Sequence, residues 1–244
     1  MLVGVMGDIH GNVDALSATL DAFDRLAVKK VFCCGDVVGY GGSPGTCIDL
    51  LRERRIPTTR GNHDTYTVEP GKYNARSIRP EANVAIEWTR RVLRDDQKDW
   101  LRTLPMVFKT SDFMVTHASC QPYPPWMYVM GQRTAAMQVL FQPQQLCFNG
   151  HSHVPILVHH RPGRMPVIDF LRDTELPRQG MVMVGVGAVG QPRDGDWRSC
   201  AVLYDTNTRK VTLLRVHYDV ATAQRRIRDA GLPDFLAERL SNGQ

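Results

Sequence analysis

The chain opens with Met1-Leu2-Val3-Gly4-Val5-Met6-Gly7-Asp8-Ile9-His10-Gly11-Asn12, an apolar run that ends at once in a polar, glycine-containing loop. Val3 to Met6 therefore predict a buried strand. An amphipathic stretch from Val13 to Leu26 follows, and Asn12 and Asp14 are residue types preferred at the start of a helix. The opening residues thus predict a strand, a polar loop and a helix.

This order of elements recurs over the next residues. Apolar Val31 to Cys34 and Ile56 to Thr59 predict two further strands, and the amphipathic stretch Thr46 to Arg54 lies between them. Such alternation indicates parallel strands joined by crossover helices. Polar residues follow each strand, in Gly7-Asp8-Ile9-His10, Gly35-Asp36 and Gly61-Asn62-His63-Asp64. Because ligands bind beyond the carboxyl ends of such strands, we expect the functional site there.

The rest of the chain changes character twice. Residues 65–104 form a mostly helical insertion by their pattern, and residues 220–244 form a helical tail that is interrupted around Gly231-Leu232-Pro233. Short strands are predicted between these segments, at Val107 to Lys109, Phe113 to Thr116, Leu146 to Phe148, Ile156 to His159, Val167 to Phe170, Met181 to Val184, Ala201 to Tyr204 and Val211 to Val216. At 244 residues we expect residues 1–244 to form one α/β domain.

The composition excludes several classes of protein. Apolar residues make up 43% and charged residues 23% of the chain, which is typical of a globular protein. No apolar run approaches the ~18 residues of a membrane span, and the opening run lacks the basic flank of a signal peptide. The six cysteines form no C-x-x-C pair, which favours reduced thiols. We therefore expect a cytoplasmic protein without a membrane partner.

The net charge of +5 favours anionic partners, but the basic residues are mostly dispersed. They cluster only in Arg52-Glu53-Arg54-Arg55 and Arg225-Arg226-Ile227-Arg228, both in helix-like stretches. No aromatic residues are interleaved with them, so a solvated helix face is favoured over a nucleic-acid surface.

Five of the eight histidines lie in polar clusters with Asp8, Asp36 and Asn62. Imidazole, carboxylate and amide oxygen suit Mn, Fe, Zn, Ni or Co, whereas a structural zinc site would recruit cysteines. In an extended segment, Asp8-x-His10 and His151-x-His153 would each place two side chains on one side. Asn62 and His63 would then project to opposite sides. The pattern predicts a catalytic metal site.

The ordered motifs resemble those of the calcineurin-like metallophosphoesterase superfamily, and most closely its small bacterial and archaeal phosphodiesterase-like branch. They are Gly7-Asp8-Ile9-His10-Gly11-Asn12, Gly35-Asp36-Val37-Val38-Gly39-Tyr40-Gly41, Gly61-Asn62-His63-Asp64, Thr116-His117-Ala118 and Gly150-His151-Ser152-His153. The resemblance extends to about Ala201 and includes the Val186 to Asp196 run. It implies a four-layer αββα sandwich of two mixed sheets with a dinuclear metal site at one end.

The resemblance also implies roles for single residues. Asp8, His10 and His153 would hold one divalent ion, Asn62, His117 and His151 the second, and Asp36 would bridge both. Manganese is expected first, with Fe, Zn, Ni or Co as alternatives. A metal-bridging hydroxide would attack the phosphorus of a phosphodiester or nucleotide. His63 would stabilise the transition-state charge or protonate the leaving oxygen.

One motif departs from the family's phosphatase members. Protein phosphatases and symmetrically cleaving diadenosine tetraphosphate hydrolases continue the second motif as Val-Asp-Arg-Gly, whereas this chain has Val38-Gly39-Tyr40-Gly41. The carboxylate and arginine helpers are therefore missing there, which disfavours phosphoprotein hydrolysis. Tyr40 and Arg193 are candidate substrate contacts. Arg60 is another source of a phosphate contact, although a structural or exposed role is expected more often for either arginine. Asp64 is expected to form structural hydrogen bonds.

An aromatic stretch follows His117, from Gln121 to Met130, and contains Tyr123, Trp126 and Tyr128. Trp126 is the third candidate substrate contact, because a base could stack on it. Packing or a dimer contact is an equal alternative.

The sequence is compatible with two classes of function. A phosphoesterase is favoured over a non-catalytic scaffold of the same fold, because a scaffold would be expected to lack ligands or His63, and none is missing. Within the enzymes, a phosphomonoesterase is the alternative to cleavage of diesters or nucleotides. The sequence predicts neither the substrate nor the oligomeric state.

Overall fold

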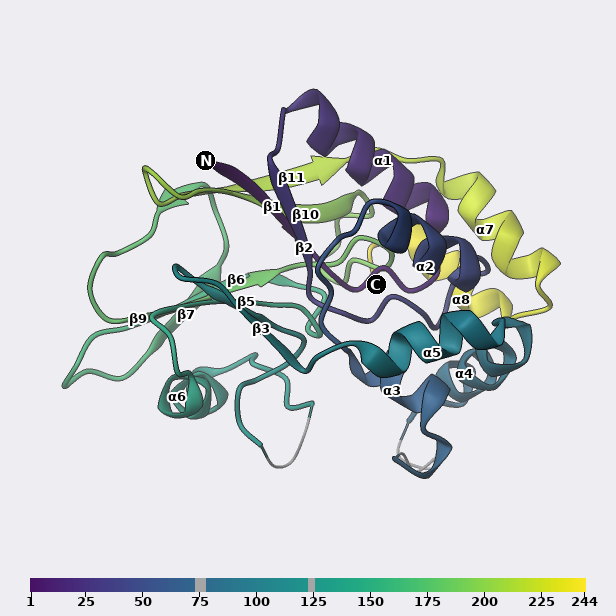
Figure 1. Cartoon of the computed structure of the whole chain (residues 1–244), viewed down its shortest axis with the longest axis horizontal. Coiled ribbons are helices and arrows are strands. Elements are labelled where there is room, and N and C mark those ends of the chain that lie inside the picture. The colour runs from purple at the N-terminus through teal and green to yellow at the C-terminus, as the bar shows by residue number, and fades with distance from the viewer. Residues whose placement is uncertain (73–77, 123–125) are drawn as a thin grey trace.

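The computed structural model describes residues 1–72, 78–122 and 126–244 (Figure 1). Its strands are β1 (Leu2–Met6), β2 (Lys30–Cys33), β3 (Val107–Lys109), β4 (Met114–Thr116), β5 (Leu146–Asn149), β6 (Pro155–His160), β7 (Val167–Phe170), β8 (Thr174–Glu175), β9 (Met181–Val186), β10 (Ser199–Asp205) and β11 (Lys210–Val216). Its α-helices are α1 (Val13–Arg25), α2 (Pro44–Glu53), α3 (Asn62–Val68), α4 (Pro80–Val92), α5 (Asp95–Thr103), α6 (Gln132–Phe141), α7 (Val220–Asp229) and α8 (Asp234–Glu238). Short 3₁₀ turns lie at Pro70–Lys72 and Arg239–Ser241.

The strands form two mixed sheets. The first has the order β2-β1-β10-β11-β8, in which only β1 and β2 are parallel. The second has the order β3-β4-β5-β9-β6-β7, in which β4, β5 and β9 are parallel. Parallel neighbours end at the same edge of a sheet, so the loops after β1 and β2 lie together, as do those after β4 and β5.

Strand β1 lies in the interior of the first sheet and shows how the two sheets pack. Val3 and Val5 are fully buried in the cluster between the sheets, where they join Phe148 and Val184 of the second sheet. Met6 points to the opposite side and packs with residues of α1 and α2. This two-residue period places one face of β1 in the sandwich and the other beneath the helices.

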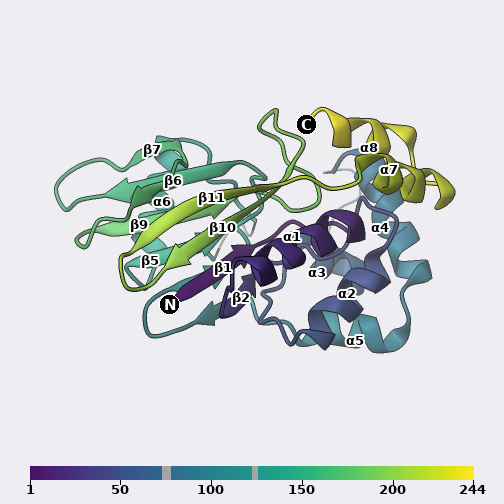
Figure 2. The ribbon, with the colours of Figure 1, turned by 90° about the horizontal axis from the view of Figure 1, so that it is seen from above.

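Helices cover the outer face of each sheet. Helices α1 and α2 bury Leu16, Phe23 and Ile48 against the first sheet. Helix α6 buries Ala135 against Met183 of the second sheet. The predicted four-layer αββα sandwich is thereby confirmed (Figure 2).

The remaining helices gather at one end of the two sheets (Figure 2). Helices α7 and α8 of the C-terminal tail form a cluster with α4, in which Ile227 and Leu236 pack with Ala85. Tyr40, from the loop after β2, packs against the same cluster. The tail therefore contacts the end of the sandwich at which β1 and β2 terminate.

One predicted strand is wrong, and two elements of the structure were not predicted. Residues Ile56 to Thr59 are not a strand, because only an isolated bridge between Cys33 and Thr58 forms there. Helix α6 and the two-residue strand β8 were not predicted. Helix α6 has mixed apolar and polar residues without a clear face, and a strand as short as β8 carries little periodic signal. The single domain over residues 1–244 stays a prediction.

The two basic clusters lie on helices and are largely neutralised. Arg52 pairs with Asp96 at 2.6 Å and Arg54 with Asp24 at 2.8 Å. On α7, Arg226 and Arg228 pair with Asp14 and Asp234 at 2.9 Å each. These ion pairs favour the interpretation of both basic clusters as solvated helix faces over that of a nucleic-acid surface. Among the described residues, no helix has the length and apolar character needed to cross a membrane.

Candidate metal centre

Five candidate ligands lie in loops with left-handed backbone. The φ angles are 52° at Asp8, 50° at His10, 50° at Asp36, 67° at His151 and 58° at His153. The extended backbone predicted for Asp8-x-His10 and His151-x-His153 is therefore wrong, although the side chains of Asp8 and His10 do converge. Left-handed backbone is costly for residues with a side chain and clusters at functional sites. Here it turns successive side chains into one buried space.

Asn62 and His63 also differ from their predicted arrangement. They begin helix α3, so their directions are set by a helical turn and not by strand alternation. Both side chains are buried. The His63 backbone N–H donates to Asp36 Oδ1 at 2.8 Å, which ties the start of α3 to the loop after β2.

Glycines precede the ligands because the backbones and carboxylates approach closely. A Cβ at Gly61 would overlap the Asp36 carboxylate, and a Cβ at Gly150 would overlap that of Asp8. The His151 backbone N–H donates to Asp8 Oδ2 at 2.9 Å. These two glycines therefore hold the loops at a spacing that no other residue type permits.

The ligand atoms of Asp8, His10 and His153 converge. His10 Nε2 lies 3.1 Å from His153 Nε2, and His153 Nε2 lies 3.5 Å from Asp8 Oδ1. His10 Nε2 is 4.0 Å from Asp8 Oδ1. All three side chains are buried.

A second group lies beside the first. His117 Nε2 lies 3.0 Å from Asn62 Oδ1 and 3.1 Å from His151 Nδ1. Asp36 lies between the two groups, since its Oδ2 is 3.6 Å from His10 Nε2 and 3.4 Å from His117 Nε2. The structure therefore brings all seven predicted ligands into one buried centre.

Backbone carbonyls fix the orientation of four imidazoles. His10 Nδ1 donates to the Val38 carbonyl at 3.1 Å and His117 Nδ1 to that of Cys34 at 2.9 Å. His153 Nδ1 donates to the Gln191 carbonyl at 2.6 Å, and His151 Nε2 donates to the Trp126 carbonyl at 2.8 Å. A carbonyl can only accept, so the proton lies on that nitrogen and the other nitrogen carries a lone pair. Each lone pair belongs to a nitrogen of the converging groups.

These donor atoms fit divalent metal ions. Ligand bonds of roughly 2.0–2.1 Å to a metal place neighbouring donor atoms about 3 Å apart. Burial lowers the pKa of His10, His117 and His153 well below the usual value and that of His151 to about 4, so these rings are neutral. Neutral imidazoles whose other N–H is held by a carbonyl are typical metal ligands. The His/Asp clusters are thus consistent with divalent metal ions.

His63 differs from the other four histidines. Its Nδ1 is buried without a hydrogen-bond partner and faces Gly39, where a Cβ would be too close. Its ring lies 4.5 Å from that of Tyr40 and 4.8 Å from that of His10, measured between centroids. His63 and Asn62 line a cavity of about 310 Å³ next to the donor atoms.

The candidate substrate contacts occupy different positions around this cavity. Tyr40 and Arg193 line it, and the Arg193 guanidinium lies 5.9 Å from the Tyr40 ring centroid. Trp126 is not among the described residues that line it; its ring edge packs on His117. Tyr128 lines the cavity and stacks on His151 at 4.0 Å. Tyr123 lies outside the described residues.

Two other residues have structural contacts. Asp64 accepts backbone N–H groups of Val37 at 2.9 Å and Gly61 at 2.9 Å, which confirms its structural hydrogen bonds. Arg60 pairs with Glu69 at 2.5 Å and donates to the Arg102 carbonyl. Arg60 is thus engaged within the fold.

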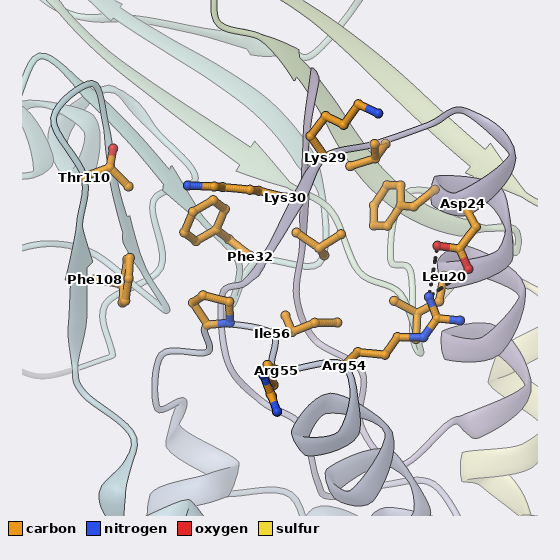
Figure 3. Close-up of a pocket in the computed structure, with 14 residues that line it drawn as sticks. Leu20, Asp24, Lys29, Lys30, Phe32, Arg54, Arg55, Ile56, Phe108 and Thr110 are labelled. Carbon is orange, nitrogen blue, oxygen red and sulfur yellow. Dashed lines mark hydrogen bonds and ion pairs between the residues drawn. The ribbon is translucent and has the colours of Figure 1, made fainter. Parts of the chain in front are cut away.

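A larger cavity, of about 550 Å³, lies at the opposite end of β2 (Figure 3). Lys30 at the start of β2 lines it, whereas Asp36 follows the end of that strand. Its one carboxylate among the labelled residues, Asp24, pairs with Arg54 (Figure 3). No histidine lines it among the described residues, so it lacks the donor set of the metal centre.

The sandwich and its buried Asp/His clusters define the fold class of the metallophosphoesterases. The family model of the calcineurin-like phosphoesterase superfamily domain matches residues 1–209. The chain therefore belongs to this superfamily. An uncharacterized protein of Methanocaldococcus jannaschii is 31% identical over 247 residues, covering 100% of this chain and 98% of that protein.

Two further comparisons agree with this assignment. The crystal structure of a metallophosphoesterase from Sphaerobacter thermophilus is 33% identical with a TM-score of 0.85, covering 100% of this chain and 99% of the other. The symmetrical bis(5'-nucleosyl)-tetraphosphatase of Actinobacillus succinogenes is 25% identical over 122 residues, which cover 48% of this chain and 44% of that protein.

Gly61→Ala should weaken metal binding by displacing Asp36, and thermal unfolding of the variant checks that the fold persists. The added Cβ would overlap both the Asp36 carboxylate and the Asp36 backbone nitrogen, so the loop after β2 must shift, while the Gly61 φ of -95° is itself acceptable for alanine. We expect a loss of about 10- to 100-fold in metal affinity, as for other groups that orient ligands. Calorimetric titration with Mn²⁺ measures it. Gly71→Ala is the matched control, because a Cβ there meets no atom within 4 Å; equal affinities in both variants would contradict the account.

Proposed function

We propose that the chain is a metal-dependent phosphoesterase that holds two divalent ions. Asp8, His10 and His153 would hold one ion, Asn62, His117 and His151 the other, and Asp36 would contact both. The observation that supports this most is the direction of the four imidazole lone pairs, which converge because backbone carbonyls accept the opposite N–H groups. Asp36 Oδ2 lies within 3.6 Å of a nitrogen from each group.

The donor set includes carboxylate and amide oxygens besides imidazole nitrogens. We propose manganese first on this ground, with Fe, Zn, Ni and Co as alternatives. When bound, two such ions supply an activated water and neutralise the charge of the phosphoryl oxygens. The chain's own contribution is to hold the ligands, bind the substrate and stabilise the leaving group.

His63 is the residue that we assign to the leaving group. It is buried beside Asn62 and lines the cavity, and its Nδ1 has no hydrogen-bond partner among the described residues. Burial and the Arg193 charge lower its pKa to about 3, so the ring is neutral and can donate an N–H. Hydrogen-bond donation to the negative charge that develops on the departing oxygen is therefore favoured over full protonation.

Phosphodiesters or nucleotides are the substrates we propose. The loop at Gly39 and Tyr40 lacks the carboxylate and arginine of the phosphatase motif; instead, the Tyr40 ring packs between His63 and Arg193. Arg193 and Tyr40 are thus positioned on the substrate side of the centre. Trp126 orients His151 through its carbonyl, and its ring is a proposed contact for bound substrate. A partial match to a protein named as a nucleosyl tetraphosphatase also favours nucleotide chemistry.

The alternatives differ in measurable ways. A phosphomonoesterase would prefer an aryl phosphate over bis(4-nitrophenyl) phosphate. A scaffold would hydrolyse neither. His63 lines the cavity, and its buried Nδ1 has no hydrogen-bond partner among the described residues. This favours an enzyme, because an unpaired buried nitrogen is costly and a scaffold would not need it.

Asp36→Asn should reduce activity more than the loss of a ligand from one group. The substitution removes a negative charge between the two groups but keeps the shape of the side chain. We expect a loss on the order of 10³-fold in kcat/KM, equivalent to several kcal/mol. Hydrolysis of bis(4-nitrophenyl) phosphate with added Mn²⁺ measures it, with His153→Ala for comparison. A milder effect for Asp36→Asn than for His153→Ala would contradict a bridging position.

His63→Gln should lose activity according to the leaving group. Alkyl and ribose oxygens develop localised charge, for which a positioned hydrogen-bond donor contributes about 10²- to 10³-fold in rate, whereas nitrophenolate needs little help. We therefore expect a steeper dependence of kcat on leaving-group basicity in the variant, with metal content unchanged. Parallel dependences for both forms would show that His63 only positions the substrate.

A further inference from the structure

The active-site cavity has a basic region that hydrolysis of a single phosphate does not use. The cavity begins at Asn62 and His63 and extends to α4 and the C-terminal tail. Among the described residues, its remaining lining comprises three arginines, three apolar residues and three tyrosines: Arg79, Arg193, Arg239, Ile78, Ala82, Ile86, Tyr40, Tyr66 and Tyr128. A volume of about 310 Å³ is at the lower end for small-molecule sites, so an organic molecule and not only a phosphate group fits.

Arg193 and Arg239 are two partly buried cations that line the same cavity. Among the described residues, neither guanidinium pairs with an aspartate or glutamate side chain, and Arg239 Nε donates to the main-chain oxygen of Gln244. Arg193 Nη2 donates to Gln191 Oε1 at 2.9 Å, and its Nε is buried without a hydrogen-bond partner. Such unpaired buried donors are rare in folded proteins and call for a ligand.

The two cations also affect each other. Burial first, and then the Arg193 charge, lower the pKa of Arg239 to about 10. Glu81 opposes this effect from beyond ion-pair distance. Arg239 stays protonated at neutral pH, so two like charges face one cavity. An anion bound between the guanidinium groups of Arg193 and Arg239 would reduce the repulsion between them.

Contacts within the tail hold Arg239 in position. Its guanidinium lies 5.4 Å from the Phe235 ring centroid, and its Nε donates to the Gln244 carbonyl at 2.6 Å. Leu236 and Leu240, on either side of it in the chain, are buried against the cluster that α4 shares. A side chain held in this way loses little freedom on binding an anion. Arg239 also lies beyond the residues 1–209 that carry the superfamily match.

We propose that the substrate carries a second phosphate group, which Arg193 and Arg239 bind. The inference rests on the proposed phosphoesterase function of the same site. The scissile phosphate lies at the metal centre, and the organic part of the substrate packs on Ile78, Ala82 and Ile86 of the cavity wall. The C-terminal tail thereby selects bisphosphorylated substrates such as a nucleotide with phosphates at two positions.

Matched substrates test the second phosphate. Thymidine 5'-(4-nitrophenyl phosphate) is compared with the same molecule bearing a 3'-phosphate, with Mn²⁺ present. We expect a higher kcat/KM for the second substrate, and we expect Arg239→Gln to reduce this preference about 10- to 100-fold, as for loss of a charge-assisted hydrogen bond. Arg239→Lys should restore part of it. Arg225→Gln removes the same charge from an exposed position of α7 and should leave the preference unchanged.

A binding measurement separates this inference from the proposed activity. Thymidine 3',5'-bisphosphate and thymidine 5'-monophosphate are titrated into the Mn²⁺-loaded protein, where tighter binding of the bisphosphate should depend on Arg239. If no substrate is hydrolysed but this difference in binding is found, the proposed function fails and the second phosphate site stands. Equal binding of the two ligands, or a preference that Arg239→Gln retains, would overturn the inference.

Discussion

The whole structure depends on one electrostatic constraint, the burial of Asp8 and Asp36 side by side with four neutral imidazoles. Desolvation raises the pKa of both carboxyl groups well above the usual value, and neighbouring Asp64 adds to this for Asp36. Their contacts within 4.0 Å among the described residues are with histidines and not with lysine or arginine. A buried carboxylate without a cation is costly. The Arg193 charge opposes the effect of burial on the pKa of both carboxyl groups from beyond ion-pair distance, and divalent ions would supply positive charge at the carboxylates themselves.

The strands and loops position these groups together. Ligands follow the ends of β1, β2, β4 and β5, so both sheets contribute to one centre. The left-handed backbone at Asp8, Asp36 and His151 turns their side chains inward, and glycines allow the loops to approach. Packing of Val3 and Val5 against the second sheet fixes the distance between the contributing strands. The strain in the loops is thus supported by the core of the sandwich.

The sequence predicted which residues converge at the candidate metal centre better than it predicted their backbone geometry. Motif order and residue chemistry identified all seven residues that converge, but the extended geometry assigned to the Asp8 and His151 segments was wrong, because positive φ at residues other than glycine has no sequence signal. Asn62 and His63 follow a glycine at the start of a short helix, where alternation does not apply. Arg239 was missed, since only tertiary packing of the tail brings it to the cavity. The substrate contact of Trp126 stays a prediction, and the orientation of His151 by the Trp126 carbonyl is a feature that a side-chain pattern does not reveal.

The central claim is that seven side chains hold two ions with Asp36 between them. Crystals of the protein grown with Mn²⁺ and measured at the manganese absorption edge test it most directly. Two anomalous peaks about 3.5–4 Å apart are predicted, the spacing of two-metal sites. One should lie among Asp8, His10 and His153, the other among Asn62, His117 and His151, with Asp36 in contact with both. A single fully occupied peak, or a peak ligated by His63 in place of one of these residues, would contradict the account.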